Sequence, residues 1–123
     1  MSREDHLGAY AKGWQEGDID TVMGSLADNF VFNDPAAGAI PKTGMAAHMT
    51  GMAKMVSEAR GVQDQQPFME LTEIVTKDED EVLTCWCWWS IPGTNFSGAG
   101  LIKVGDDGVI SEAITYNAPP AEG

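Results

Sequence analysis

The chain of 123 residues has few basic side chains. Seven Lys and Arg stand against 19 Asp and Glu, for a formal net charge of -12, and the seven are scattered rather than clustered. So acidic a chain, with no basic stripe along it, repels nucleic acid and anionic lipid. We therefore expect no nucleic-acid or membrane partner, and instead a hydrophobic small molecule, neutral or cationic, or a second copy of the chain.

Long hydrophobic runs, histidine and cysteine are also scarce. No run approaches the ~20 apolar residues of a membrane span, and the N-terminus has acids where a signal peptide needs bases. Cys85 and Cys87 lie two apart in an apolar run, share one strand face and would seldom bond to each other, so reduced thiols and a cytoplasmic location are expected. His6 and His48 have no ligand spacing between them, and we expect no metal and no cofactor.

The apolar spacing predicts one domain over residues 1–123 with its helices first. Helical spacing runs from about residue 3 to Gln15, again from Asp18 to Leu26, and a third time after Thr43 to about Gly61. A short strand ends at Pro35, and residues 35–44 have the composition of a loop. Four later apolar runs separated by turn signals predict antiparallel hairpins. The fold class is therefore α+β, with a curved antiparallel sheet wrapped around three N-terminal helices and enclosing an apolar pocket.

Asp34 is the residue most suggestive of chemistry. It alternates with Phe30 and Phe32 on one strand face, and burial of a carboxylate beside aromatic rings favours a general base. The alternative is that Asp34 and Pro35 form an ordinary strand-ending turn whose side chain bonds to its own backbone. Both interpretations stay open at this point.

Tyr10 and His48 are the next candidates. Tyr10 lies one helical turn from Trp14, so its hydroxyl either donates to a substrate oxygen or is satisfied within the core. His48 shares the apolar stripe of the third helix with Met49 and Met52, and it is either a core residue or a partner of a nearby carboxylate.

The run from Val82 to Ile91 is unusually rich in tryptophan. Trp86 and Trp88 share one strand face, and Cys85, Cys87 and Trp89 share the other. We expect one face to line the pocket and the other to pack against a partner subunit, with Trp89 and the cysteines as the candidates for a homodimer interface. The expected substrate-binding residues are Trp14, Phe30, Phe32, Met49, Met52, Trp86, Trp88 and Tyr116.

From Tyr10 to Pro35 the stretch YAKGWQEGDIDTVMGSLADNFVFNDP resembles the opening of bacterial ketosteroid isomerases, within the nuclear transport factor two-like superfamily that also includes SnoaL-like polyketide cyclases. The resemblance implies a cystatin-like cone. It also implies that Tyr10 donates a hydrogen bond to a dienolate oxygen and that Asp34 carries a proton between two carbons. The isomerases place a second, protonated acid where this chain has Gly100, so the resemblance in catalytic residues is incomplete.

Two functional hypotheses follow from these residues. The first is an isomerase, cyclase or lyase in which Asp34 is the general base on a hydrophobic carbonyl substrate, while Tyr10 and His48 polarise the oxygen. The second is a non-catalytic domain that binds a hydrophobic ligand or dimerises. Because one oxyanion donor typically contributes roughly 3 to 4 kcal/mol to transition-state stabilisation, the glycine at position 100 argues against efficient steroid isomerisation by the same design.

Overall fold

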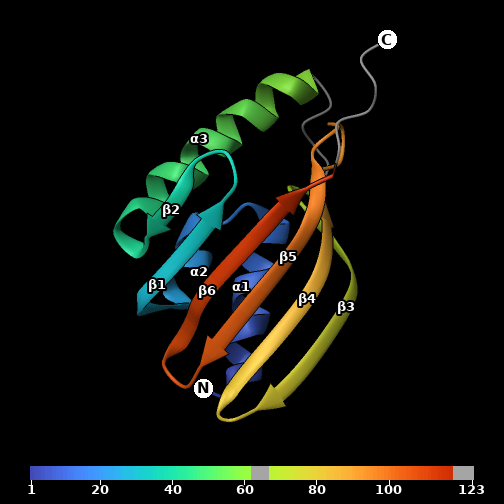
Figure 1. Cartoon of the computed structure of the whole chain (residues 1–123). Coiled ribbons are helices and arrows are strands. Elements are labelled where there is room, and N and C mark those ends of the chain that lie inside the picture. Colours follow the sequence, from blue (N-terminus) through green and yellow to red (C-terminus); the bar gives the residue numbers. More distant parts are fainter. Residues whose placement is uncertain (62–66, 118–123) are drawn as a thin grey trace.

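The computed structural model describes residues 1–61 and 67–117, and in it three helices lie against a curved six-stranded sheet (Figure 1). The helices are α1 (Arg3–Glu16), α2 (Ile19–Gly24) and α3 (Lys42–Arg60). The strands are β1 (Leu26–Asp34), β2 (Gly38–Pro41), β3 (Glu70–Glu79), β4 (Val82–Ser90), β5 (Ser97–Gly105) and β6 (Gly108–Tyr116). The predicted α+β class is confirmed.

The first two helices begin where the sequence predicts. The Ser2 side chain accepts from the backbone of Asp5 and the Asp5 side chain accepts from the backbone of Ser2, which completes a capping box. Asp18 caps α2 by accepting from the Thr21 backbone. The predicted start of α3 was wrong by two residues, because α3 begins at Lys42 with Pro41 as its N-cap and not after Thr43.

The strands are ordered β2-β1-β6-β5-β4-β3 across the sheet. The three predicted hairpins from β3 to β6 are present, and the turn after β5 brings β6 back between β5 and β1. The sheet is not antiparallel throughout, since β1 and β6 pair in parallel. This pairing carries the end of β1, where Asp34 lies, to the end of β6, where Tyr116 lies.

Residues 35–44 are not wholly a loop. Gly38–Pro41 form β2, which folds back on β1 with Asp34 opposite Gly38 and Phe32 opposite Ile40. The sequence gives little warning of this strand, because four residues with a glycine and a proline cannot show an alternating pattern. The hairpin leads directly into α3 and so fixes that helix beside the end of β1 (Figure 1).

The core lies between the sheet and the helices. Tyr10, Trp14, Phe30, Phe32 and Met45 are all nearly inaccessible to solvent there. Their rings contact one another in series: Tyr10 with Trp14 and Phe30, and Trp14 with Phe32. Such a cluster of large side chains fills most of the cone and leaves limited space for a ligand.

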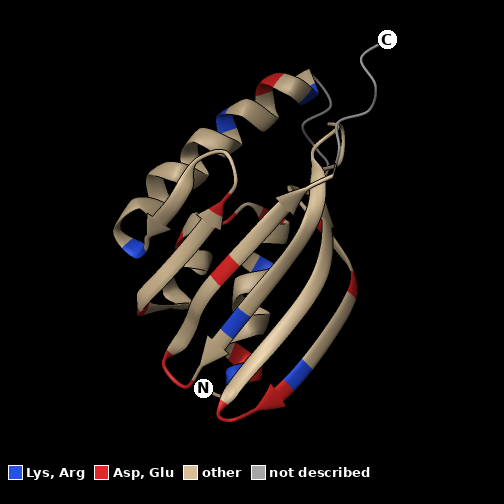
Figure 2. Ribbon diagram, in the orientation of Figure 1, with Lys and Arg blue, Asp and Glu red and all other residues tan. Residues whose placement is uncertain are grey.

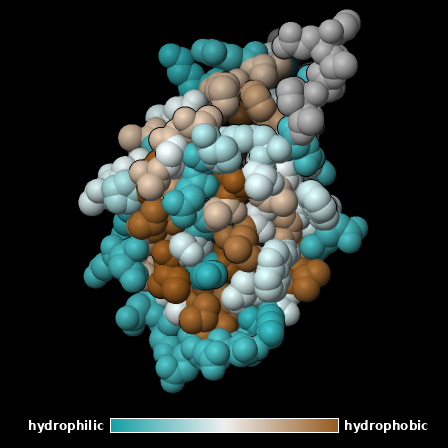
Figure 3. All heavy atoms as spheres, in the orientation of Figure 1, coloured by the Kyte–Doolittle hydropathy of each residue, from teal (hydrophilic) through white to brown (hydrophobic). Residues whose placement is uncertain are grey.

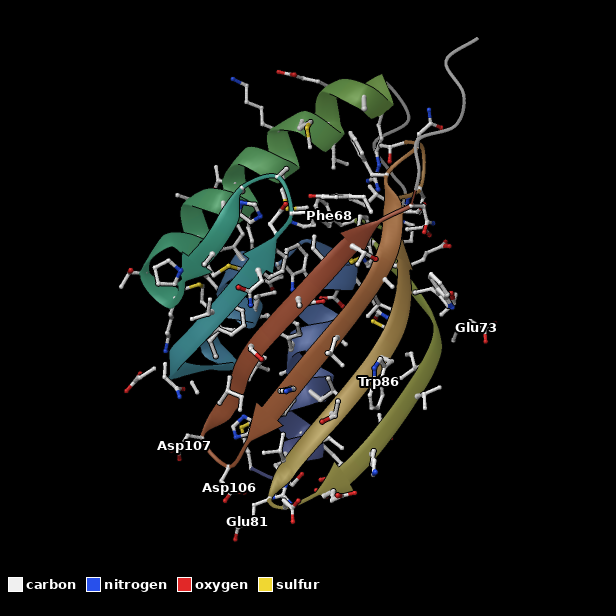
Figure 4. The ribbon with its side chains drawn as sticks, viewed as in Figure 1. Phe68, Glu73, Glu81, Trp86, Asp106 and Asp107 are labelled. Carbon is white, nitrogen blue, oxygen red and sulfur yellow. The ribbon has the colours of Figure 1, made fainter. Side chains whose placement is uncertain are left out.

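The two faces of β4 point the opposite way from the prediction, which placed Trp86 and Trp88 at the pocket. Cys85, Cys87 and Trp89 are buried toward the helices, whereas Trp86 and Trp88 are 44% and 50% exposed on the opposite face. Trp86 is labelled on that outer face in Figure 4. The expectation that Trp86 and Trp88 line the pocket was therefore wrong, and so was the choice of Trp89 and the cysteines as an outer interface.

Charged residues gather at the ends of the sheet. The hairpin turns contain acidic side chains, including Glu81, Asp106 and Asp107, and the middle of the sheet has few charges (Figures 2 and 4). Arg3 joins α1 to two of these ends by pairing with Asp78 at 3.0 Å and Asp106 at 2.6 Å. Within residues 1–61 and 67–117, no helix is long and apolar enough to cross a membrane.

Candidate functional site

The end of β1 opens into a groove of about 560 Å³ between α3 and the ends of β4, β5 and β6. Ligand pockets commonly measure roughly 300–1,000 Å³, so this groove is large enough for a small organic molecule. Its polar side chains include Asp34, His48 and Tyr116, and its apolar walls include Met52 and Trp89. Three groups able to exchange protons thus meet at the wall of a ligand-sized space.

Asp34 is only 6% exposed, and each of its oxygens has a different environment. Oδ1 accepts from the backbone N–H groups of Ala36 at 2.8 Å and Ala37 at 3.2 Å. These bonds form the strand-ending turn that was the alternative interpretation of Asp34. Oδ2 accepts from the Tyr116 hydroxyl at 2.9 Å and lies 3.8 Å from His48 Nε2. One oxygen therefore orders the turn while the other belongs to the groove.

His48 and Tyr116 hold complementary positions around Asp34. His48 comes from α3, where its ring contacts Phe32, and its Nε2 is buried without a hydrogen-bond partner. Tyr116 comes from β6 and packs edge-on against Trp89. Burial and the hydrogen bond to Asp34 raise the pKa of Tyr116 to about 12, so its hydroxyl remains a proton donor at neutral pH.

Tyr10 does not line this groove. Its hydroxyl donates a short hydrogen bond to Glu112 Oε1 on β6, deep between α1 and the sheet. The two residues line an inner cavity of about 30 Å³ whose other walls are mostly apolar. About 10–15 Å³ is enough for one water molecule, so this cavity accommodates a single small group.

Glu112 was not among the predicted site residues. It is 6% exposed, and desolvation raises its pKa from the usual 4.5 to about 7 even though the Tyr10 hydrogen bond lowers it. Burial also raises the pKa of Tyr10 well above its ordinary range. The alternation of side chains along the strand could have identified it, because Glu112 lies two residues from Ile114 and so shares the strand face of an apolar, buried side chain.

Gly100 explains how Glu112 fits into the sheet. A Cβ atom at position 100 would lie 2.5 Å from Glu112 Oε2 and 3.6 Å from Cys87 Sγ. The carboxyl group of Glu112 thus occupies the space that a side chain on β5 would use. The conclusion that a second acid is missing must be corrected in this respect: position 100 has none, but an acid from the neighbouring strand reaches the same space.

The predicted substrate-binding residues divide among four environments, one of which is the exposed outer face that holds Trp86 and Trp88. Trp14 and Phe32 line the inner cavity, Tyr116 lines the groove, and Met52 lines both. Phe30 and Met49 are packed in the core, away from these two spaces. The periodicity identified which residues face inward but not which of the inward residues border a space.

The two thiols also face the interior. A hydrogen bond with Cys85 raises the pKa of Cys87, and the same bond lowers the pKa of Cys85. Both cysteines are free. In the part of the chain that the structure describes, no three His, Cys, Asp or Glu side chains are grouped as a metal ion would require.

The sequence matches no protein-family model and no curated protein. Solved structures, in contrast, resemble this one over almost its whole length. An NTF2-like protein of unknown function from Cytophaga hutchinsonii has a TM-score of 0.66 at 13% identity, covering 95% of this chain and 91% of that one. The fold is NTF2-like.

Two further structures with the NTF2-like fold have names that suggest activities for those proteins. A candidate polyketide cyclase from Xanthomonas campestris has a TM-score of 0.64 at 15% identity, covering 94% of this chain and 90% of that one. A ketosteroid isomerase-like protein from Erwinia carotovora has the same score and identity and covers 94% of each chain. At these identities the likeness establishes the architecture, which hosts many functions, and leaves the chemistry to the site.

Proposed function

We propose that the protein is a small-molecule enzyme in which Asp34 is the general base for proton transfer on a hydrophobic carbonyl compound bound in the groove. The observation that carries this proposal is the meeting of a buried carboxylate with His48 and Tyr116 at the wall of a ligand-sized space. Tyr116 holds Asp34 Oδ2 toward the groove, where a proton on a carbon next to a carbonyl is within its reach. Fold neighbours named as cyclase-like and isomerase-like proteins are consistent with such chemistry.

The apolar walls of the groove favour a hydrophobic, uncharged substrate. Met52, Trp89, Ile91 and Phe96 border the groove, while the protein as a whole has a net charge of -12. An apolar, uncharged molecule enters such a space without the electrostatic cost that an anion would meet. This reasoning supports a hydrophobic ketone, ester or related carbonyl compound and gives no individual substrate.

A non-catalytic ligand-binding domain is the second candidate, and one observation favours it. Asp34 Oδ1 accepts two backbone hydrogen bonds in a turn that needs no substrate, so the residue has a structural role of its own. In that case the groove holds a hydrophobic compound without changing it.

Exchange of α-protons for deuterium separates the two candidates, because it detects proton abstraction whatever the final product. β,γ-Unsaturated ketones, enolisable polyketides and epoxides would be incubated with the protein in D₂O and followed by NMR, which also reports their turnover. We expect exchange or turnover to fall by at least about 100-fold in Asp34→Asn. The control is Asp28→Asn, which changes a fully exposed carboxylate on the same strand. Binding without exchange, or exchange that is unchanged in Asp34→Asn, supports the binding domain instead.

A further inference from the structure

A second groove, of about 350 Å³, lies on the helix side of the sheet between α1 and strands β3, β4 and β5 (Figure 1). We call it the thiol groove, because the side chains of both cysteines, Cys85 and Cys87, line it. Its other lining residues are mostly apolar and are Glu4, Leu7, Gly8, Ala11, Leu71, Ile74, Thr76, Asp78, Leu83 and Ile102. Because Asp34, His48 and Tyr116 line the other groove, the proposed proton transfer leaves the thiol groove unused.

Small residues on α1 keep the thiol groove open. Gly8 and Ala11 line it, and a Cβ atom added at Gly8 would meet nothing within 4 Å. Gly8 is exposed, so the groove reaches solvent along the helix. The cysteines are otherwise enclosed, since Cys85 is 3% and Cys87 is 4% exposed. A small molecule in the thiol groove therefore approaches two sulfur atoms that the rest of the surface conceals.

The two thiols differ in how readily they ionise. The hydrogen bond with Cys85, burial and the nearby Glu112 carboxyl all raise the pKa of Cys87. Cys87 therefore keeps its S–H proton, and the same hydrogen bond lowers the pKa of Cys85. Because the thiolate rather than the thiol attacks electrophiles, Cys85 is the better nucleophile of the two.

The charges around the thiol groove disfavour anions. Glu4 and Asp78 are the charged residues of its lining, and both are exposed acids. Arg3 offsets only part of this charge, because it is shared between Asp78 at 3.0 Å and Asp106 at 2.6 Å. Apolar walls with an acidic edge favour a small uncharged electrophile over an anionic one.

We propose that Cys85 is a covalent attachment site for small, uncharged α,β-unsaturated carbonyl compounds that enter the thiol groove, and that Cys87 is the positioning residue that holds its sulfur. In this step Cys85 gives its proton to water, its sulfur bonds to the β-carbon, and the carbon–carbon π bond breaks. The electron pair passes to the carbonyl as an enolate, and water returns one proton to the α-carbon. The adduct is the sum of the two molecules, so the reaction requires no oxidant or reductant. This inference goes beyond the proposed function and does not depend on it.

N-Ethylmaleimide is the probe, because it is a small, uncharged α,β-unsaturated carbonyl compound. Intact-mass and fragment-ion mass spectrometry follow its addition to the folded protein at pH 7. We expect one equivalent to add at Cys85, and the rate to fall at least about tenfold in Cys85→Ser. 3-Maleimidopropionic acid has the same reactive ring and a carboxylate. It should add at least about threefold more slowly, after each rate is divided by that for a cysteine peptide, and the difference should shrink as salt increases.

Two pairs of variants test the positioning and the groove. Cys87→Ser keeps a hydrogen-bond donor and should leave the rate within about twofold, whereas Cys87→Ala removes the donor and should slow addition at Cys85 about fivefold. Gly8→Leu places a side chain in the thiol groove and should slow addition at least about tenfold. Gly51→Leu on α3 is the matched control and should not change the rate. Like Gly8, Gly51 is an exposed helical glycine with nothing within 4 Å of an added Cβ.

Addition that proceeds through unfolding would overturn the site. In that case urea well below the unfolding midpoint accelerates it in proportion to the unfolded fraction, and Cys85 and Cys87 react equally. Equal rates in Gly8→Leu and Gly51→Leu, or equal normalised rates for the two maleimides, would also contradict the proposal. The proposed function is tested separately, by deuterium exchange in Asp34→Asn.

Discussion

At the scale of single residues, Asp34 is a buried acid with one oxygen held in a turn and the other beside two side chains of the groove. The residues that complete its environment, His48 and Tyr116, come from α3 and from β6 at the far end of the chain. The sequence offered His48 as a partner of a nearby carboxylate, and it lies beside Asp34. Tyr10, which the resemblance makes a donor to a substrate oxygen, donates to Glu112 instead. Which polar groups meet depends on strand register, and a one-residue change of register reverses the face of every side chain.

The stability of the protein should depend on the protonation of Glu112. Its pKa is about 7 in the folded protein against 4.5 ordinarily, so the folded state binds this proton more tightly than the unfolded state does. The free energy of unfolding therefore decreases as pH rises from 4.5 to about 7, by up to about 3 kcal/mol from this group. Glu112→Gln should remove that decrease, because glutamine still accepts from Tyr10 but does not titrate.

Urea denaturation of both proteins at pH 4, 6 and 8 measures this effect. The stability of Glu112→Gln relative to the unmodified protein should increase with pH, with most of the change between pH 4.5 and 7. The exposed acid Glu81 gives the control variant Glu81→Gln. A difference between Glu112→Gln and the unmodified protein that is the same at all three pH values would show that Glu112 does not titrate in this range.

At the scale of helices and strands, the sequence was informative wherever an element is long and amphipathic. The helical spacing from about residue 3 and from Asp18, and the alternation in β4, predicted elements that are present. Short elements and the pairing of distant strands were harder to predict from the sequence. The strand β2 is too short for a pattern, and the parallel pairing of β1 with β6 joins segments about 80 residues apart through contacts that local sequence does not encode.

The glycines of β5 illustrate how packing between strands can require a residue without a side chain. A Cβ atom at Gly98 would overlap the carbonyl oxygen of Thr115 on β6 and lie 2.8 Å from the Trp89 ring on β4. The Trp89 Nε1–H donates to the carbonyl of Ala99 at 3.2 Å, which keeps the indole against this part of β5. The absence of a side chain at position 98 thus allows three strands to approach one another closely.

Gly98→Ala should consequently destabilise the protein by about 3 kcal/mol or more, because backbone atoms must move to make room. The matched control, Gly51→Ala in α3, should stabilise it by about 0.5–1 kcal/mol, since alanine is the better helix former and nothing obstructs its Cβ. Thermal unfolding followed by circular dichroism measures both changes. Equal melting temperatures for the two variants would contradict the close approach of β6 at Gly98.

At the scale of the whole molecule, one face of the sheet is covered by helices and the other is open. The open face carries Trp86 and Trp88 on β4, with Val75 opposite Trp86 on β3 and Leu101 opposite Trp86 on β5. Figure 3 shows hydrophobic residues over the middle of this face, with some hydrophilic ones between them, and mostly hydrophilic residues along its lower rim. Apolar surface gathered in this way, inside a charged border, is typical of a protein interface.

We propose that the open face pairs two copies of the chain, with Trp86 and Trp88 at the centre in place of Trp89 and the cysteines. A second copy suits this face better than a charged partner does, because the acids of the hairpin turns lie at the rim and the side chains around the tryptophans are mostly uncharged, with Lys103 on β5 beside them (Figure 2). Two-fold symmetry would set the same tryptophans against each other, and burial of large aromatic side chains commonly dominates the energy of such interfaces.

Trp86→Glu should convert the protein to a monomer at micromolar concentration, because each dimer would have to bury two like charges in an apolar contact. Light scattering should give twice the chain mass of 13.2 kDa for the unmodified protein and a single chain mass for the variant. Met55→Glu is the matched control, since Met55 is 45% exposed, as Trp86 is 44% exposed, but lies on α3. Because Trp86 contributes nothing to the groove or the inner cavity, ligand binding should survive in the monomer. An unmodified protein that is itself monomeric at tens of micromolar would contradict the proposal and leave the tryptophan face to some other partner.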